Sequence, residues 1–293
     1  MKFESLKEKC EYFRSLTDYR LVPNSYVIAF LDGRAFSHMI KNKYKKPFDD
    51  TFVRIMNEVA EYLVKNIQGA KFAYTQSDEI SILITDFDTP DTDAAFGYRI
   101  CKLQSILASM AASKFNQLAL LYDVESRLYD NCLFDSVSTI YKASEVLDEL
   151  KNQKLVEFDC KVWTVPDYNT AFCHFLWRQN DCVRNSKQQT AQSFVSHKEL
   201  TGKSADEQIE LCKIEKGVDW NEFDDGLKYG RLIYKERKLF KNYVVDNETA
   251  GYDGVAVQTM QEQEYIRNVW SSHPADIFGD ENSIIKKLIP QRV

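Results

Sequence analysis

The segment YVIAFLDGRAFSHM (26–39) begins with an uninterrupted apolar run, which Asp32 and Gly33 end abruptly. A short apolar run bounded by a turn signal is typical of a strand buried on both faces. Asp-Gly is also a common turn pair. The segment alone therefore leaves two interpretations open: an ordinary turn, or a carboxylate placed for chemistry at the end of a central strand.

Strand-like and helix-like patterns follow this strand in a defined order. They predict a helix over 50–67, strands over 71–75 and 80–85, a helix over 100–121 and a strand over 156–165. Asp49 and Asp50 can cap the first helix, and QSDE between the two middle strands is a hairpin signal. The order β-α-β-β-α-β predicts an α+β fold of the ferredoxin-like, split βαβ type.

The pattern also suggests two regions. Residues 1–166 form the predicted ferredoxin-like domain, with an insert at about 122–154 that includes a possible helix at 142–153. Residues 167–293 form a C-terminal region with a helix over about 168–193. A capping box from Ser204 to Glu207 predicts another helix before Gly217, and short strands, turns and helices are expected after it.

Composition narrows the class of protein. With 293 residues, 44% hydrophobic residues and only 10 Gly and 6 Pro, the chain can bury a substantial core. No apolar run approaches the ~18 residues of a membrane span. The charged start and seven cysteines without a C-x-x-C pair favour reduced thiols in the cytoplasm or an organellar matrix, not secretion.

Charge alone does not identify a partner. The net charge of −6 is unusual for a nucleic-acid binder, although local patches matter more than totals. Two basic clusters are present, and a solvated surface is the simpler interpretation of each. They are KNKYKK (41–46) and the set Lys228, Arg231, Lys235, Arg237, Lys238 and Lys241.

The predicted topology brings carboxylates together. In a ferredoxin-like sheet the first strand is the neighbour of the hairpin, so Asp32 is expected near Asp78 and Glu79. Adjacent carboxylates repel unless a cation neutralises them. Mg²⁺ prefers oxygen ligands, and two such ions can stabilise both the attacking and the leaving oxygen of a phosphoryl transfer. The alternative is that Asp78 and Glu79 lie on a solvated hairpin.

Other chemistries have weaker support. The four histidines lack metal-ligand spacing, which argues against a zinc hydrolase. There is no P-loop and no G-x-G-x-x-G motif, so triphosphate binding would rest on metals and lysines.

Several motifs in order resemble one family. They are LDGRAFSHM (31–39), YKKPFD (44–49), YTQSDEISILI (74–84), FLWRQNDCVRNSKQQTAQ (175–192), SHKELTGKSADEQIEL (196–211) and KGVDWNEF (216–223). Together they resemble the tRNA-His guanylyltransferase superfamily, whose members add nucleotides to RNA 5′ ends in the 3′-to-5′ direction. The resemblance covers residues 1 to about 240. It implies a polymerase-type palm, in agreement with the predicted strand order.

The resemblance also implies roles for individual residues. Asp32 and Asp78 correspond to ligands of two Mg²⁺ ions, Gly33 offers its carbonyl, and Glu79 is a further catalytic residue. The implied nucleotide-binding residues are Arg34, Ala35, Phe36, Lys46, Ser77, Arg99 and Lys102. Candidate RNA contacts are Arg178, Gln179, Asp181, Arg184, Asn185, Lys198 and Lys203, for which surface or helix-packing roles are equally open.

One departure from the family pattern concerns specificity. Enzymes dedicated to tRNA-His carry His-Ile-Asn-Asn where this chain has Val183 to Ser186. The missing histidine favours the "like" branch, which repairs 5′-truncated tRNAs against a template strand. The resemblance thus implies a homotetrameric, Mg²⁺-dependent nucleotidyltransferase that uses ATP or GTP to activate 5′-monophosphate ends. Alternatives are a dedicated tRNA-His guanylyltransferase, a palm-type nucleotide cyclase and a non-catalytic RNA-binding module.

Overall fold

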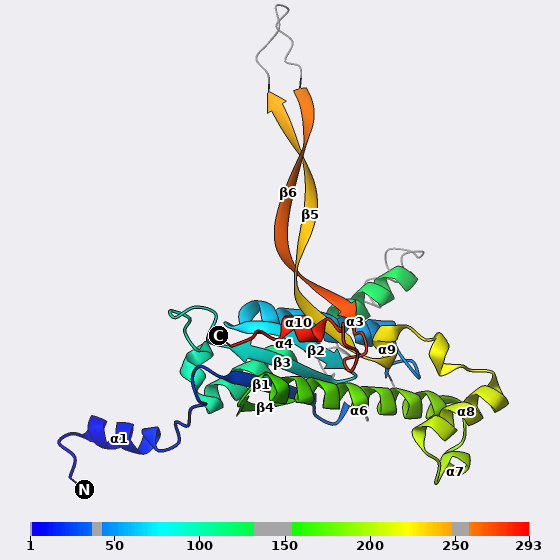
Figure 1. Cartoon of the computed structure of the whole chain (residues 1–293), viewed down its shortest axis with the longest axis horizontal. Helices are drawn as coiled ribbons and strands as arrows, with labels where there is room; N and C mark the ends of the chain where they lie inside the picture. Colours follow the sequence, from blue (N-terminus) through cyan, green and yellow to red (C-terminus); the bar gives the residue numbers. More distant parts are fainter. Residues whose placement is uncertain (1, 37–42, 132–153, 248–257, 293) are drawn as a thin grey trace, which may run out of the picture.

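The protein is described by a computed structural model over residues 2–36, 43–131, 154–247 and 258–292. A central sheet is packed between helices, helix α1 (Leu6–Ser15) extends from one side, and a long two-stranded ribbon projects from the body (Figure 1). Over the described residues, no helix combines the length and the apolar character needed to cross a membrane.

Four strands form the core of the sheet. They are β1 (Tyr26–Gly33), β2 (Ala70–Gln76), β3 (Glu79–Thr85) and β4 (Phe158–Val165). Their order is β4-β1-β3-β2, and each neighbouring pair is antiparallel. This is the ferredoxin-like arrangement, so the predicted α+β fold is confirmed.

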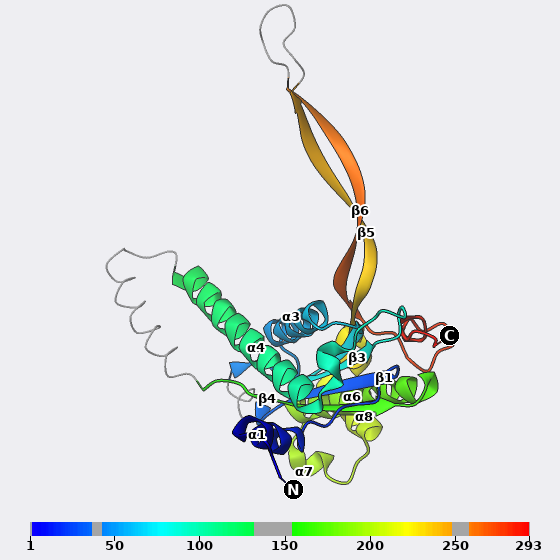
Figure 2. The same cartoon turned by 90° about the vertical axis from the view of Figure 1, so that its left-hand side faces the viewer.

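Helices cover both faces of the sheet, which explains the continuous apolar run of β1. Side chains alternate along a strand, and Val27, Ala29 and Leu31 pack against α3 (Asp50–Asn66) and α4 (Ile100–Asn131). Tyr26 and Ile28 face the opposite layer, which contains α6 (Tyr168–Phe194) and the end of the chain (Figure 2).

Local capping agrees with the sequence. Asp49 accepts a hydrogen bond from the Phe52 amide at 2.9 Å and begins α3. Ser204 and Glu207 form the predicted capping box, and Gly217 ends the helix in the left-handed conformation. Shorter helices among the described residues are η1 (Ala95–Tyr98), α7 (His197–Leu200), α8 (Ala205–Lys216), η2 (Trp220–Glu222), α9 (Asp225–Lys228) and α10 (Ile285–Leu288).

The prediction of short strands after residue 218 is wrong. β5 (Arg231–Asn247) and β6 (Gln258–Pro274) each have 17 residues and pair with one another along their whole length. The start of β5 also pairs with β2 and so extends the sheet to six strands. Beyond the first residues of β5, the β5–β6 ribbon projects from the body. Because neither face of the ribbon packs on a core there, its strands do not need the alternating apolar pattern by which strands are recognised in sequence.

One helix boundary also differs from the prediction. α4 continues to Asn131, into the segment predicted as an insert. The possible helix at 142–153 lies outside the described residues.

The C-terminal segment packs against the sheet. Ile285 and Ile289 are buried in the same apolar cluster as Tyr26, and the Tyr26 hydroxyl donates a hydrogen bond to the Pro290 carbonyl at 2.8 Å.

Candidate active site

The ends of three neighbouring strands bring carboxylates together. Asp32 near the end of β1 is in register with Glu79 at the start of β3 and with Asp159 near the start of β4. Asp78 precedes Glu79 in the turn that joins β2 to β3. Asp32, Asp78 and Glu79 therefore lie at one edge of the sheet, as the topology predicts.

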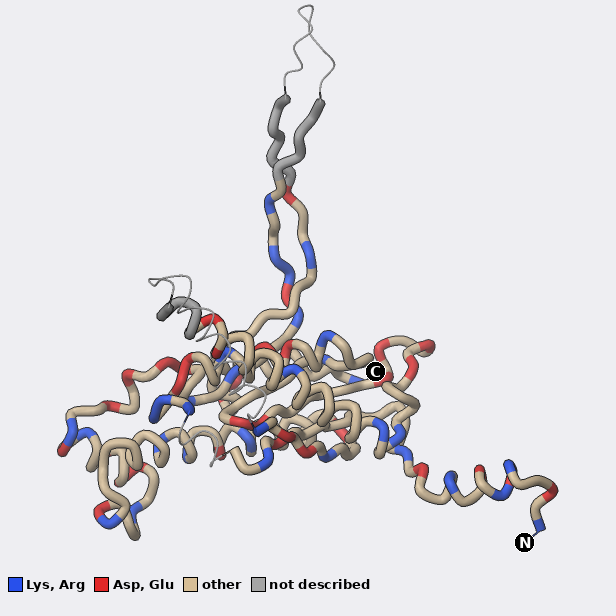
Figure 3. The backbone as a smooth tube through the Cα atoms, turned by 180° about the vertical axis from the view of Figure 1, so that it is seen from behind, with Lys and Arg blue, Asp and Glu red and all other residues tan. Residues whose placement is uncertain are grey.

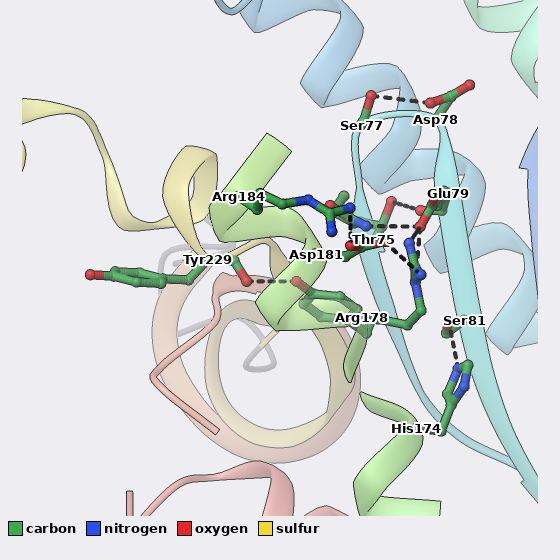
Figure 4. A network of polar contacts seen from close by, with 12 residues as sticks. Thr75, Ser77, Asp78, Glu79, Ser81, His174, Arg178, Asp181, Arg184 and Tyr229 are labelled. Carbon is green, nitrogen blue, oxygen red and sulfur yellow. Dashed lines mark hydrogen bonds and ion pairs between the residues drawn. The ribbon is translucent and has the colours of Figure 1, made fainter. Parts of the chain in front are cut away.

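The turn that carries Asp78 is tightly built. It consists of Ser77 and Asp78, and Ser77 has a φ of 47°, in the left-handed region. The Ser77 hydroxyl lies 3.1 Å from an Asp78 carboxylate oxygen, and the Thr75 hydroxyl donates to the Glu79 carbonyl at 2.9 Å (Figure 4). These bonds hold the turn, and with it the Asp78 carboxylate, in one arrangement.

The electrostatics of the site disfavour two unneutralised carboxylates. Burial raises the pKa of Asp78 to about 6, and the nearby charge of Asp32 contributes to the shift. Burial is also the main cause of the raised pKa of Asp32, followed by the charge of Asp159. The raised pKa values mean that each group binds a proton more readily than a free aspartate, because burial and a neighbouring carboxylate both disfavour its charged form.

The donor set fits Mg²⁺ that also binds phosphate. Within the ranges that the structure describes, no group of three or more His, Cys, Asp or Glu side chains is arranged so that it could hold a metal ion by itself. Mg²⁺ does not need such a cage, because it is usually held by one or two carboxylates together with substrate phosphates and waters. Asp32 and Asp78 supply that minimum set.

Glu79 has a different environment from the two aspartates. Its Oε2 atom accepts hydrogen bonds from Arg178 Nε at 3.1 Å, Arg178 Nη2 at 2.5 Å and Gln76 Nε2 at 2.8 Å. Burial raises the pKa of Glu79, while the Arg178 cation opposes that shift. One carboxylate oxygen of this predicted catalytic residue is thus committed to the protein itself.

The Arg178 contact continues along α6. Arg178 Nη1 lies 3.0 Å from Asp181, and Asp181 also pairs with Arg184, whose side chain is 58% exposed (Figure 4). Only the outer end of this ion-pair chain, Arg184 with the exposed Asn185 beside it, faces solvent. The buried Arg178 is not available for the RNA contact that the sequence suggested.

Gln179 is also a structural residue. Its side chain donates to the Asp276 carbonyl at 2.7 Å and accepts from the Phe278 amide at 2.7 Å, which fastens α6 to the C-terminal segment. Burial of Gln179 disfavours direct RNA binding. Lys198 on α7 and Lys203 before α8 are exposed and remain candidates.

A cavity lies directly beside the turn. α3, the β2–β3 turn, α6 and α9 enclose it, and its lining includes Ser77, Asp78, Asn185 and Lys45. The predicted nucleotide residue Ser77 and the metal-ligand candidate Asp78 thus border one hollow. Lys46 is exposed next to this lining.

The segment after Asp32 is organised by packing. Phe36 is 2% exposed, and its ring packs against Phe115 and Phe158, so it is a core residue and not a base-stacking platform. A Cβ on Gly33 would lie only 2.2 Å from the Phe36 ring. Close ring packing is therefore a reason for glycine here, besides the carbonyl access that the sequence suggested.

The neighbouring Arg34 and Ala35 are exposed. Arg34 pairs with Glu157 at 2.8 Å, and Ala35 has a φ of 58°. Both are exposed within three residues of Asp32, which is the placement that the predicted nucleotide contacts require.

Arg99 and Lys102 lie elsewhere. Arg99 lies just before α4 in a β-bridge with Arg20, and Lys102 lies in the first turn of α4, at the end of the sheet where β1 starts. Arg99 pairs with Asp18 at 2.5 Å. Since Asp32 lies six residues after the start of β1 at Tyr26, and each residue adds about 3.3 Å, roughly 20 Å separates this end from Asp32. Within one chain, these two residues cannot contact a triphosphate held at Asp32 and Asp78, contrary to the sequence prediction.

Residues of both charges are spread over the body and the described part of the ribbon (Figure 3). Most of the second basic cluster is engaged in ion pairs within the chain. Lys228 is buried and pairs with Asp225 at 2.9 Å, and Arg231 pairs with Asp224 at 3.0 Å. Lys238 on the ribbon pairs with Glu236 at 3.0 Å. The solvated-surface interpretation does not hold for Lys228, because that side chain is buried.

Comparison with known proteins identifies the family. A family model described as tRNAHis guanylyltransferase matches residues 7–166, more than half of the chain. The chain belongs to the tRNA-His guanylyltransferase family. Members of this family are nucleotidyltransferases, and the enzyme class predicted from the sequence is confirmed.

Individual relatives agree. A tRNA(His) guanylyltransferase of Candida glabrata is 26% identical over 85% of this chain and 99% of its own length. An uncharacterized protein of Acanthamoeba polyphaga mimivirus is 27% identical over 80% of this chain and 78% of its own. A bacterial tRNA-His guanylyltransferase-like protein, solved in complex with ATP, matches with a TM-score of 0.73 and 25% identity, covering 98% of this chain and 100% of that one.

Two residues of the site were not identified from the sequence. Asp159 lies beside Asp32 across β1 and β4, and Gln76 supports Glu79. Asp159 could have been found by aligning VEFDCKVWTV with the first strand, because the apolar positions of this segment fix which residue lies beside Asp32. Nothing local marks Gln76.

Proposed function

We propose that this protein adds nucleotides to the 5′ ends of 5′-truncated tRNAs, in the 3′-to-5′ direction and directed by the opposing template strand. The observation that supports this most is the pair of partly buried aspartates, Asp32 and Asp78, at the palm edge of a chain that belongs to this family. Two solved structures described as a bacterial tRNA-His guanylyltransferase-like protein, one in complex with ATP and one with GTP, support nucleoside triphosphates as substrates.

Two chemical steps account for the addition. An oxygen of the RNA 5′-monophosphate attacks the α-phosphorus of ATP or GTP, so that a nucleotidylated end forms and pyrophosphate leaves. The 3′-hydroxyl of an incoming nucleoside triphosphate then attacks the RNA 5′-phosphorus, and the activating nucleoside monophosphate leaves. An RNA with a 5′-triphosphate needs no activation, because pyrophosphate is already its leaving group.

The residues of the site divide these tasks. Asp32 and Asp78 would hold Mg²⁺, which when bound supplies positive charge where oxygen charge develops. The cavity beside Ser77 and Asp78 receives the nucleotide. Lys46, exposed at its rim, contributes a cation toward the triphosphate. Arg184 and Asn185 at the solvent-facing end of the ion-pair chain are placed to contact RNA.

The dedicated tRNA-His enzyme is the second candidate, since the relatives carry that name. Val183 argues against it, because this side chain packs against the apolar cluster around Trp220 and offers no hydrogen bond to a base. A base-specific histidine has no counterpart at this position.

A direct assay tests the proposal. Radiolabelled tRNA transcripts lacking the first nucleotide are incubated with Mg²⁺ and each nucleoside triphosphate, and products are resolved at single-nucleotide length. The proposal expects extension by one nucleotide that requires Mg²⁺. Cyclised nucleotide without RNA extension would favour the cyclase, and RNA binding with no product would favour the non-catalytic module.

The position of Arg99 and Lys102 bears on assembly. If these residues contact the triphosphate as family resemblance implies, they must do so from another copy of the chain, which supports a homo-oligomer such as the tetramer implied by resemblance. Mixing inactive Asp78→Ala protein with inactive Arg99→Ala/Lys102→Ala protein would then restore activity in hybrid oligomers. No restoration, with a monomer by light scattering, would contradict this assembly.

A further inference from the structure

Arg178 is the most completely engaged cation near the site. Its side chain is 6% exposed, and all three guanidinium nitrogens face carboxylate oxygens. Nε and Nη2 bind Glu79 at 3.1 and 2.5 Å, and Nη1 lies 3.0 Å from Asp181 (Figure 4). A planar fork that binds two carboxylates at once fixes their relative positions.

The Glu79 end of this contact holds the turn that carries Asp78. Gln76 and Glu79 flank the turn, and the Gln76 amide donates to the same Glu79 oxygen that Arg178 binds. The left-handed Ser77 is a costly conformation for a residue other than glycine and persists only where its surroundings fix it. The Gln76–Glu79–Arg178 contact supplies such surroundings.

Arg178 also touches the strand that carries Asp32. Its guanidinium carbon lies 5.4 Å from the centroid of the Phe30 ring, two residues before Asp32, and 4.6 Å from the Trp177 ring. One side chain from α6 thus contacts both β1 and the start of β3. These are the two elements whose relative position sets the spacing of Asp32 and Asp78.

We propose that Arg178 is a positioning residue that fixes the spacing of the Asp32 and Asp78 carboxylates through its contacts to Glu79 and Phe30. This inference rests on the proposed function of the same site. Arg178 contacts neither nucleotide nor RNA in this role. Its loss should therefore slow the chemical step and weaken Mg²⁺ activation, and it should leave nucleotide affinity largely intact.

Two substitutions separate charge from geometry. Arg178→Lys keeps the positive charge but cannot reproduce the fork, and Arg178→Met keeps only the apolar stem. We expect kcat for nucleotide addition to fall about 10- to 100-fold in Arg178→Lys, as for a lost charge-assisted hydrogen bond, and further in Arg178→Met. KM for the nucleoside triphosphate should stay within about twofold of the wild type, and the half-saturating Mg²⁺ concentration should rise.

Lys187→Met is the matched control. Lys187 lies on the same helix, pairs with Asp206 at 2.5 Å and sits over the Trp220 ring at 4.9 Å, but it does not contact the turn. It tests whether losing any partly buried cation of α6 has the same effect. We expect its kcat and Mg²⁺ dependence to match the wild type.

The outcomes are distinguishable. If wild-type protein adds no nucleotide, the proposed function fails before Arg178 is tested. If wild type is active and both Arg178 variants keep wild-type kcat, or change KM alone, the positioning role is refuted. If the Arg178 variants unfold below the assay temperature, the Gln76→Met variant is used instead, because it removes one donor to Glu79 and leaves Arg178 in place. A lowered kcat with an unchanged KM in this variant supports the inference. An unchanged kcat overturns it.

Discussion

Asp78→Asn should make the metal-free protein more stable while it abolishes activity. Burial and the charge of Asp32 raise the pKa of Asp78 from 3.8 to about 6. At 1.36 kcal/mol per unit, this shift corresponds to about 3 kcal/mol by which the folded state disfavours the charged form. Asp78 keeps some solvent contact, which screens its charge, so we expect about 2 kcal/mol of gain from the neutral amide.

The sign of the pH dependence follows from proton binding. Between pH of about 4 and 6 the folded wild type holds a proton on Asp78 that the unfolded chain has lost, so wild-type stability falls as pH rises through this range. The advantage of Asp78→Asn should be complete above pH of about 6 and should disappear toward pH 4. The Ser77 hydroxyl can still donate to the amide oxygen, so the turn is retained.

Thermal unfolding in EDTA at a series of pH values measures this effect. At about 2 °C per kcal/mol for a chain of this size, the melting temperature at pH 7.5 should rise by roughly 4 °C. Asp167→Asn is the control, because the pKa of Asp167 is lowered by its hydrogen bonds to Thr170 and no stability gain is expected there. A melting temperature of Asp78→Asn equal to or below the wild type at pH 7.5, or a gain that persists unchanged at pH 4, would refute the reasoning.

Three further predictions concern the same region. Asp32→Ala or Asp78→Ala should abolish nucleotide addition while the circular dichroism spectrum stays native, because each removes a metal-ligand candidate. Near-normal turnover in either variant would mean that Asp32 is an ordinary turn residue. Lys46→Ala should lower kcat/KM for the nucleoside triphosphate by about tenfold through loss of one charge-assisted contact, and an unchanged value would remove Lys46 from the site. Gly33→Ala should destabilise the fold by about 1–3 kcal/mol in urea unfolding, because its Cβ overlaps the Phe36 ring; wild-type stability would show that the ring moves without cost.

The palm could be predicted from sequence because its signals are local. The apolar run before Asp32, the Asp49 cap and the QSDE turn each follow from neighbouring residues, and the strand order follows from them. Antiparallel register then places Asp32 beside Glu79 with no further information.

Other features could not be predicted because they depend on distant contacts. Arg178 pairs with Glu79, which lies 99 positions earlier in the sequence, and helical periodicity does not predict that pairing. Arg99 and Lys102 are only three residues apart in the sequence, but only the path of the chain shows that α4 begins at the far end of the sheet from Asp32. The β5–β6 ribbon pairs mainly with itself, so it lacks the buried face that marks a strand in sequence.

The most direct test of the proposed function changes the template and not the enzyme. Two truncated tRNAs of different identity are prepared, each in versions that carry a different base opposite the missing first nucleotide, and all four nucleoside triphosphates are offered together. The account predicts that both tRNAs are extended and that the added nucleotide follows Watson–Crick pairing with the opposing base. Extension restricted to tRNA-His, or addition of G whatever base lies opposite, would contradict it.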